Sequence, residues 1–347
     1  MDTLFESRKA DHIRLSLDSK NQAIGASGFE QIHLFHEALP ECNFSDIDLR
    51  SHFWRYEASS PCFISSMTAG HHKGESLNLC LAKIAGKKKW PMGLGSQRRE
   101  LTDPAAHEEW KRLRKKAPDT AFFSNLGLTQ LIEVGATKAL KLVENLESIA
   151  FIIHTNPLQE ALQEEGTPNF TGGLKALEKL CKNSKVPIII KETGSGFSPY
   201  TLKKLLALGV AVIDVSGLGG THWGRIEGGR AHENSLRAKA AETFAYWGEP
   251  TVSTLLNATK LRSLKKGCKT EIWASGGIRS GLDVAKSLAI GANKVGFAKP
   301  ALEAAVLGEE SLEKWINLIE IELRIALYCT GSKNINALQR GRKWQKI

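Results

Sequence analysis

Residues 150–170 read AFIIHTNPLQEALQEEGTPNF, and the change of character within this stretch decides the fold prediction. Its apolar beginning, 150–153, stops abruptly at a cluster of polar side chains: His154, Thr155, Asn156, Gln159 and Glu160. A short apolar run that ends in polar groups is typical of a buried strand whose C-terminal end carries a site. An ordinary turn after a core strand, built on Asn156-Pro157, explains the same letters. The other apolar runs of the chain distinguish the two interpretations.

Seven further apolar runs end in the same way, in polar or glycine-rich residues: 62–68, 90–96, 121–127, 186–193, 210–217, 270–277 and 293–300. Segments with helical periodicity separate most of them, and several of these segments end at a glycine, such as Gly86, Gly209 or Gly291. Strands that alternate with helices predict right-handed βαβ units and a parallel sheet. Eight such units predict an α/β fold of the (β/α)8 TIM-barrel type. The alternative, a doubly wound open sheet, would leave strands unassigned.

The barrel prediction divides the chain into three segments of one structural domain. Residues 1–60 form an N-terminal arm and lead-in, 61–330 form the barrel, and 331–347 form a basic C-terminal tail that we expect to be mobile. The connection between the sixth and seventh runs is unusually long and begins glycine-rich, which is typical of a functional loop. Its second part, 251–264, predicts a helix, and 312–327 predicts the eighth helix of the barrel.

The composition favours a cytoplasmic protein. Six cysteines are scattered among 347 residues without a CxxC pair, which suits a reducing compartment rather than a disulfide framework or a zinc site. No apolar run approaches the roughly 18 residues that span a bilayer, and the charged start lacks a signal-peptide core. The net charge of +10 fits nucleic acid, a membrane surface or anionic small molecules. Because no basic motif is interleaved with aromatic residues, we expect no nucleic-acid partner, and we expect no membrane partner either.

The loops after the seventh and eighth runs carry the features of a phosphate site. The letters ASGGIRSG (274–281) place Gly276 and Gly277 between a strand and a helix, where backbone N–H groups and the helix N-terminus attract anions. The letters GFAKP (296–300) end the next strand. Phosphates bind between these two loops in many barrels, although a single glycine pair is usually only a tight corner. Because both loops are correctly placed, the sequence predicts phosphate binding.

A lysine, Lys191, closes the fifth run, and a buried ammonium requires an anion or a polarised carbonyl. Three interpretations stay open: a cation beneath a cofactor ring or phosphate, an ion pair with a strand-end carboxylate such as Asp214, and a Schiff-base nucleophile. The first three runs end in neutral hydrogen-bonding groups and one arginine. Such groups around a lysine suit a flat heteroaromatic ring such as flavin, although each one alone also fits a strand-end cap.

The best candidate for a metal ligand is Glu160, beside Gln159 at the mouth of the predicted barrel. One carboxylate together with substrate phosphates commonly holds Mg²⁺, but a first-turn glutamate also stabilises a helix N-terminus. Arg8, Lys9 and Arg98 could neutralise a diphosphate or lie on a solvated surface. No strand-end cysteine has an obvious base nearby, and no pair of carboxylates indicates a glycosidase.

These motifs occur together, in this order, in one family of enzymes. The chain resembles the type 2 isopentenyl-diphosphate isomerases, FMN-dependent flavoproteins on a TIM barrel. The matching segments extend from residue 7 to about residue 330. They include SRKADHI (7–13), GLGSQR (93–98), NPLQE (156–160), IDVSGLGGTHWGRIEGGR (213–230) and SGGIRSGLDVAKSLAIGA (275–292).

The resemblance implies an activity, cofactors and residue roles. The family interconverts isopentenyl diphosphate and dimethylallyl diphosphate with reduced FMN, a reductant such as NADPH, and Mg²⁺, and it often forms tetramers or larger homo-oligomers. By motif, the diphosphate would be held by Arg8, Lys9, Ser96, Gln97 and Arg98. The catalytic residue would be Gln159, with Glu160 on Mg²⁺ and with His154 and Asn156 lining the pocket. FMN would contact Ser66, Met67, Thr68, Ser96, Asn125, Lys191, Ser216 and Thr221, and its phosphate would lie on Gly276, Gly277, Ile278, Arg279, Ala298 and Lys299.

One departure from the family pattern touches the predicted site. The family usually has an aspartate where this chain has Thr167, which puts a loop contact in doubt but not the Mg²⁺ ligand. Two other functions would fit the same barrel. An FMN-dependent oxidoreductase of a small hydroxy acid would use His154, but the nearby Glu160 is unfavourable beside a carboxylate substrate. A non-catalytic flavin-binding protein would not need Gln159, Glu160 and Lys191.

Overall fold

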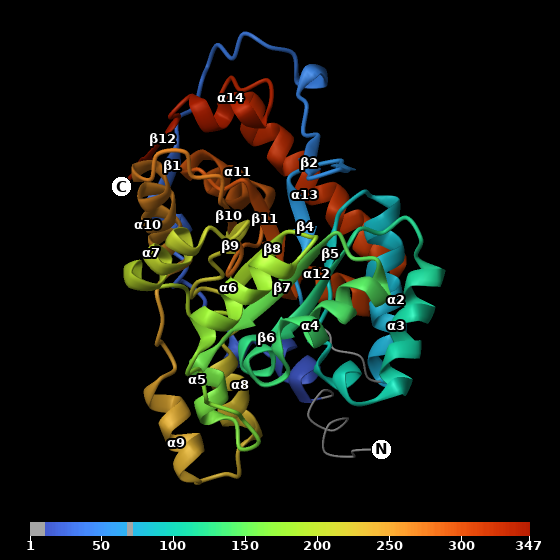
Figure 1. The fold of residues 1–347 in the computed structure, drawn as a ribbon. Helices are drawn as coiled ribbons and strands as arrows, with labels where there is room; N and C mark the ends of the chain where they lie inside the picture. Colours follow the sequence, from blue (N-terminus) through green and yellow to red (C-terminus); the bar gives the residue numbers. More distant parts are fainter. Residues whose placement is uncertain (1–10, 68–71) are drawn as a thin grey trace.

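The computed structural model describes residues 11–67 and 72–347 and shows a closed barrel of eight parallel strands (Figure 1). The strands follow one another around the barrel in chain order, and β11 closes the ring by pairing with β4. Each strand lies within one of the predicted apolar runs: β4 (Cys62–Ile64), β5 (Met92–Gly93), β6 (Phe122–Gly127), β7 (Ala150–Thr155), β8 (Ile188–Glu192), β9 (Val212–Asp214), β10 (Glu271–Ala274) and β11 (Lys294–Phe297). The predicted (β/α)8 fold is confirmed, and the doubly wound alternative is wrong.

Helices surround the barrel, and several begin at a side-chain cap. Asp103 caps α3, Ser198 caps α7, and Ser280 forms a capping box with Asp283 at the start of α11. The helix expected over 251–264 is present as α10, and the expected last barrel helix is extended at both ends as α13. The helices are α2 (His72–Lys87), α3 (Pro104–Lys116), α4 (Leu128–Leu146), α5 (Pro157–Leu162), α6 (Gly173–Asn183), α7 (Pro199–Leu208), α8 (Trp223–Arg230), α9 (Leu236–Thr243), α10 (Thr251–Leu264), α11 (Gly281–Ile290), α12 (Lys299–Val306) and α13 (Glu309–Cys329).

The N-terminal end of the barrel is filled by aromatic side chains. Phe53, Phe63, Phe123 and Trp273 pack there with ring centroids 5.0 to 6.2 Å apart, and all four are buried. Phe53 comes from the hairpin of β2 (Ser51–Phe53) and β3 (Tyr56–Ala58), which covers this end. Burial of an apolar side chain of this size contributes about 2 kcal/mol. This packing leaves the opposite end, where the strands terminate, as the place for a cavity.

The C-terminal tail packs against the lead-in, whereas the sequence predicts a mobile tail. It forms α14 (Ile335–Arg340) and β12 (Trp344–Lys346), and β12 pairs antiparallel with β1 (Ile32–Leu34). The ammonium of Lys343 donates to the carbonyl of Thr330. The partner strand is about three hundred residues away in the chain, so no local pattern in the tail reveals this pairing.

The segment after residue 10 crosses the C-terminal end of the barrel. The N–H of Ala23 donates to the carbonyl of Gly220 at 2.8 Å, and Gln22 forms a β-bridge with Thr221. In Figure 1, α5, α8 and α9 project from this same end. Residues 11–17 of this segment are helical, and the described structure also contains short 3-10 turns: η1 (Ser19–Asn21), η2 (Phe29–Gln31), η3 (Phe44–Asp46) and η4 (Arg98–Leu101).

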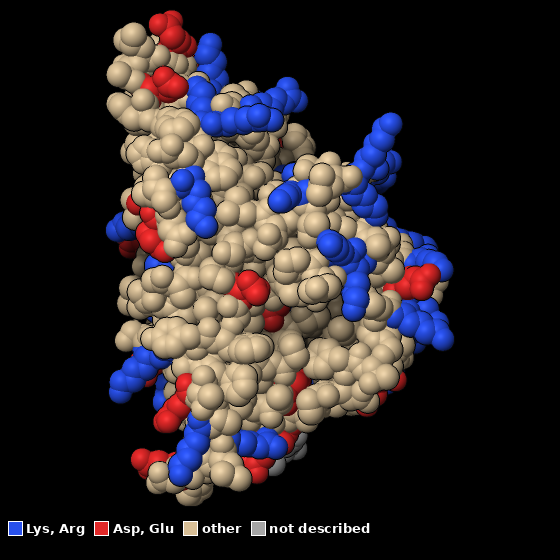
Figure 2. Space-filling model, turned by 90° about the vertical axis from the view of Figure 1, so that its left-hand side faces the viewer, with Lys and Arg blue, Asp and Glu red and all other residues tan. Residues whose placement is uncertain are grey.

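Charged side chains on the surface are dispersed. On the face shown in Figure 2, Lys and Arg lie among uncharged residues with Asp and Glu between them, rather than in one continuous basic strip. Lys87, from the lysine cluster 87–89, pairs with Glu313 at 2.7 Å, which agrees with a solvated, ion-paired face. Among the described residues, no helix is both long and apolar enough to cross a bilayer.

Candidate active site

A cavity of about 390 Å³ lies at the C-terminal ends of the strands. Residues at or just after every barrel strand line it, and Trp223 of α8 and residues of the N-terminal segment, including His12, Gln22 and Ile24, complete its wall. The predicted site residues that line it are Ser66, Met67, Ser96, Arg98, Asn125, His154, Gln159, Glu160, Lys191, Ser216, Thr221, Gly276, Gly277, Ile278, Arg279, Ala298 and Lys299. The structure therefore brings these residues together, while the role of each one stays a prediction.

Of the other five predicted residues, three lie outside the described part of the chain and two, Gln97 and Asn156, are described but do not line the cavity. Arg8, Lys9 and Thr68 lie outside the described residues. Gln97 is buried behind the wall, where its Oε1 accepts from the N–H of Asn125 at 2.9 Å. The side chain of Asn156 caps α5 by accepting from the N–H of Gln159 at 2.9 Å. Gln97 thus acts as a strand-end cap, and Asn156 acts as a helix N-cap in the turn after β7.

Lys191 makes the ion pair with Asp214 that the sequence left open. The two groups face each other from adjacent strands, with Lys191 Nζ 3.1 Å from Asp214 Oδ2. Lys191 also donates to Ser275 Oγ at 2.9 Å, and Ser275 Oγ donates to Asp214 Oδ1 at 2.6 Å. An ammonium held by a carboxylate is a poor nucleophile, which disfavours the Schiff-base interpretation.

The glycines of the β9 and β10 loops bring two backbones into contact. Gly276 has a φ of +94°, and a Cβ placed there would lie 2.4 Å from the carbonyl oxygen of Gly217. A Cβ at Gly220 would lie 2.7 Å from the backbone nitrogen of Gly277. Side chains are therefore excluded, and backbone groups form this part of the cavity wall.

Two serines that follow β4 supply unsatisfied polar atoms at the cavity wall. The hydroxyls of Ser65 and Ser66 are buried and have no hydrogen-bond partner within the described part of the chain, yet both residues line the cavity. A buried polar atom without a partner is costly, so these hydroxyls are suited to a polar ligand. A glycine-lined backbone cradle, a paired lysine and unsatisfied hydroxyls together fit a phosphorylated heteroaromatic ring.

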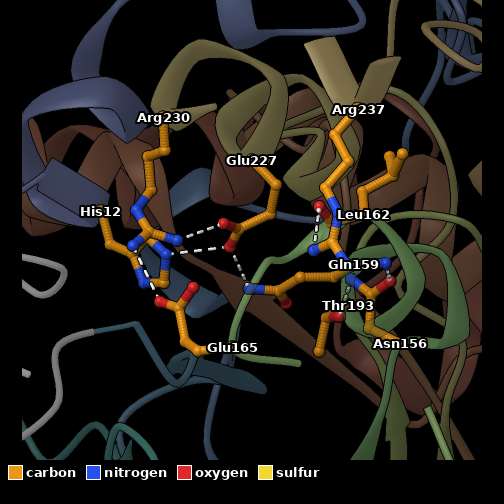
Figure 3. A network of polar contacts seen from close by, with 9 residues as sticks. All are labelled: His12, Asn156, Gln159, Leu162, Glu165, Thr193, Glu227, Arg230 and Arg237. Carbon is orange, nitrogen blue, oxygen red and sulfur yellow. Dashed lines mark hydrogen bonds and ion pairs between the residues drawn. The ribbon is translucent and has the colours of Figure 1, made fainter. Parts of the chain in front are cut away.

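A buried carboxylate that the sequence did not indicate, Glu227 of α8, organises the other side of the cavity (Figure 3). Its Oε1 lies 2.9 Å from Nε2 of His12 and accepts from Nε2 of Gln159, also at 2.9 Å. Its Oε2 pairs with the guanidinium of Arg230, which also bonds Glu165 at 2.8 Å. Burial alone would raise the pKa of Glu227, but the bonds and charges of these partners lower it from 4.5 to about 2. Glu227 is therefore an anion that joins the N-terminal segment, α5 and α8.

Glu227 also determines how the Gln159 amide is used. The amide donates one of its two N–H groups to the carboxylate, so the second N–H and the carbonyl Oε1 are the parts of the amide left for a ligand. Glu227 lies within the letters RIEGGR, which contain its partner Arg230 three residues later but give no sign of His12 or Gln159. Only the fold places it beside Gln159, 68 positions earlier in the chain.

Glu160 closes a loop rather than joining a cluster of carboxylates. Its Oε2 accepts from the backbone N–H of Thr167 at 2.8 Å, at the position where the family usually has aspartate. Within residues 11–67 and 72–347, no group of three or more His, Cys, Asp or Glu side chains is arranged to hold a metal ion. A metal at Glu160 would thus take most of its ligands from substrate and water.

Comparisons with known proteins agree with this geometry. Residues 144–345 match the family model described as FMN-dependent dehydrogenase. The chain is 49% identical over 96% of its length to an isopentenyl-diphosphate delta-isomerase of Bdellovibrio bacteriovorus, 96% of which is covered. It is 48% identical to the isopentenyl-diphosphate delta-isomerase of Legionella pneumophila (strain Corby), with 96% of each chain covered. This chain belongs to the isopentenyl-diphosphate delta-isomerase family.

Solved structures of proteins outside this isomerase family have a similar fold. A mutant flavocytochrome b2 with benzoylformate matches with a TM-score of 0.69 at 20% sequence identity, over 94% of this chain and 78% of that one. At this identity the likeness shows the barrel fold alone. The resemblance read from the motifs is confirmed by the isomerase relatives, which favour the isomerase over the hydroxy-acid oxidoreductase. The FMN-dependent family model supports FMN as the cofactor, and the cavity fits it.

Proposed function

We propose that this protein interconverts isopentenyl diphosphate and dimethylallyl diphosphate, a step that supplies isoprenoid precursors. The observation that carries the proposal is one cavity that joins a glycine cradle to Gln159 and Glu160, in a chain 49% identical to a named isomerase. The reaction moves a double bond by one carbon without net oxidation. It requires a proton to be added at one carbon and removed from another.

FMN would be held at the strand ends by groups of two kinds. The backbone of Gly276 and Gly277, with Arg279 and Lys299, would bind the phosphate, and Lys191, Asn125 and Ser66 would face the ring. When bound in its reduced form, FMN supplies an electron-rich ring with exchangeable protons for acid–base chemistry. NADPH is the proposed source of electrons for that form.

Gln159 would act at the hydrocarbon end of the substrate. An amide does not ionise in the working pH range, so this residue would orient a proton donor or relay a proton rather than supply one. Its bond to Glu227 holds the amide in one orientation. The nearby indole of Trp223 provides apolar surface against an uncharged alkene.

The diphosphate would lie at the mouth of the cavity. Arg98 and Glu160 line the cavity, and Glu160 would share Mg²⁺ with the diphosphate oxygens. Arg8 and Lys9 are proposed to contribute positive charge, by motif. Binding energy from this unreactive end would position the alkene for proton transfer.

Two further proposals concern the setting of the enzyme. All six cysteines are free, which supports a reducing compartment such as the cytoplasm. A homo-oligomer, tetrameric or larger, is proposed by resemblance, and light scattering of the purified protein would measure it.

An anaerobic assay tests the proposed reaction. Purified protein would be incubated with FMN, NADPH or dithionite, Mg²⁺ and isopentenyl diphosphate, and dimethylallyl diphosphate would be followed by chromatography. We expect product only when reduced flavin and Mg²⁺ are both present. Protein that holds FMN but forms no product under these conditions would contradict the proposal.

A further inference from the structure

Three buried polar groups on neighbouring strands form a closed set at the cavity wall. Lys191 lies on β8, Asp214 lies opposite it on β9, and Ser275 follows β10 directly. Each is at most 4% exposed. Lys191 and Ser275 line the cavity, whereas Asp214 does not.

The hydrogen-bond donors of Lys191 are divided between protein and cavity. An ammonium has three N–H groups, and the structure assigns one to Asp214 Oδ2 at 3.1 Å and one to Ser275 Oγ at 2.9 Å. The second oxygen of Asp214 accepts from the Ser275 hydroxyl at 2.6 Å. Each group in the set therefore fixes the other two, and one N–H of Lys191 is left for a ligand.

Stability alone is a weak explanation for this arrangement. Desolvation of two charges offsets most of their attraction, and apolar residues of similar volume are often as stable as a buried ion pair. The surrounding barrel core is filled with such residues, including Ile189, Val212 and Trp273. A function of the Lys191–Asp214 pair at the cavity would explain why these two charges are buried here.

We propose that Asp214 and Ser275 are positioning residues for the flavin ring, acting through Lys191. They hold the ammonium at the wall and keep its remaining N–H available to the bound ring. This inference rests on the proposed FMN cofactor. Asp214 itself does not touch the cavity, so its effect on the flavin has to pass through its two partners.

Two conservative variants test the inference by FMN binding, without an activity assay. Asp214→Asn keeps the shape of the side chain but removes the counter-charge, and Ser275→Ala removes the bridging hydroxyl and leaves the ion pair. We expect the dissociation constant of FMN, titrated into flavin-free full-length protein, to rise at least tenfold for Asp214→Asn, which is about 1.4 kcal/mol. We expect a smaller rise for Ser275→Ala. In both variants, the visible circular dichroism of protein saturated with FMN should change.

Ser124→Ala is the matched control for a buried serine. Its hydroxyl bonds Ser148 Oγ at 2.8 Å and the carbonyl of Leu142 at 3.2 Å, and the residue does not line the cavity. We expect this variant to lose thermal stability while keeping wild-type FMN affinity and an unchanged flavin spectrum.

The outcomes separate this inference from the proposed function. Wild-type protein that does not bind FMN would overturn the cofactor and the positioning role together. Wild-type protein that binds FMN, with Asp214→Asn and Ser275→Ala unchanged in affinity and spectrum, would overturn only the positioning role. If Asp214→Asn does not fold, the Ser275→Ala and Ser124→Ala pair decides the question on its own.

Discussion

Replacing Glu227 by glutamine removes the charge at the centre of the network in Figure 3 while keeping the shape of the side chain. In the native protein this carboxylate is 2% exposed and is bonded by His12, Gln159 and Arg230. An amide in its place can still bond Gln159, but it cannot neutralise the guanidinium. We therefore expect the variant to fold with a looser contact between the N-terminal segment, α5 and α8.

The magnitude follows from the pKa of Glu227. Its partners lower the pKa from 4.5 to about 2, and this difference corresponds to about 3 kcal/mol at about 1.4 kcal/mol per pH unit. A carboxyl whose folded-state pKa is depressed stabilises the protein fully above its unfolded-state value of 4.5. This contribution is lost as the pH falls from 4.5 toward 2. The variant lacks the titrating group, so it should be less stable at neutral pH and lose less stability in acid.

Urea unfolding at several pH values measures this difference. We expect the free energy of unfolding of the variant to be lower by about 3 kcal/mol near neutral pH, with the gap narrowing below about pH 4.5. Glu165→Gln is the control, because Glu165 pairs with the same Arg230 but its side chain is 41% exposed. That exposed pair should be worth less than about 1 kcal/mol. A neutral-pH difference within about 0.5 kcal/mol of zero, or a gap independent of pH, would refute the reasoning.

Three other substitutions probe the remaining groups. Gln159→Asn shortens the side chain and should keep FMN affinity while lowering turnover at least about a hundredfold in initial-rate assays; lost FMN binding would indicate a structural role instead. Glu160→Gln should raise the Mg²⁺ concentration for half-maximal activity about tenfold or more, and an unchanged Mg²⁺ titration would remove Glu160 as the ligand. Burial raises the pKa of Glu192 to about 7 against the lowering effect of backbone N–H bonds from residues 193–196. A carboxyl with a raised pKa makes the folded protein less stable as the pH rises from 4.5 to about 7. Glu192→Gln removes this titration, so the thermal-unfolding midpoint of the variant should depend less on pH in this window. An identical pH dependence in the variant and the wild type would contradict the raised pKa of Glu192.

The barrel was predictable because the sequence features that indicate it, short apolar runs separated by helical segments, each lie within a few neighbouring residues. Buried parallel strands need continuous apolar runs, and each run here is short enough to be counted directly in the sequence. The importance of the glycines at 276 and 277 could also be predicted, because only glycine tolerates the close approach of the β9 and β10 loops. Lys191 could be recognised as needing a partner, and its ion pair with Asp214 was one of the options considered.

Contacts between distant segments were not predictable in this way. Glu227 meets Gln159 and His12 only after α5, α8 and the N-terminal segment have assembled. The tail strand β12 finds its partner in β1, at the other end of the chain. Asn156 was placed in the pocket by motif, yet its side chain is used to cap α5, since a single polar residue can serve either purpose. Composition and periodicity carry no information about such pairings.

The most direct test of the proposed isomerase is the reaction in deuterated water. Anaerobic protein with reduced FMN and Mg²⁺ would be given isopentenyl diphosphate, and the product would be analysed by mass spectrometry alongside the flavin absorbance. We predict dimethylallyl diphosphate that carries solvent deuterium in a methyl group, with the flavin still reduced at the end. Product without deuterium would contradict proton addition and removal. Substrate-dependent reduction of oxidised FMN by a hydroxy acid, without any dimethylallyl diphosphate from the first reaction, would contradict the isomerase itself.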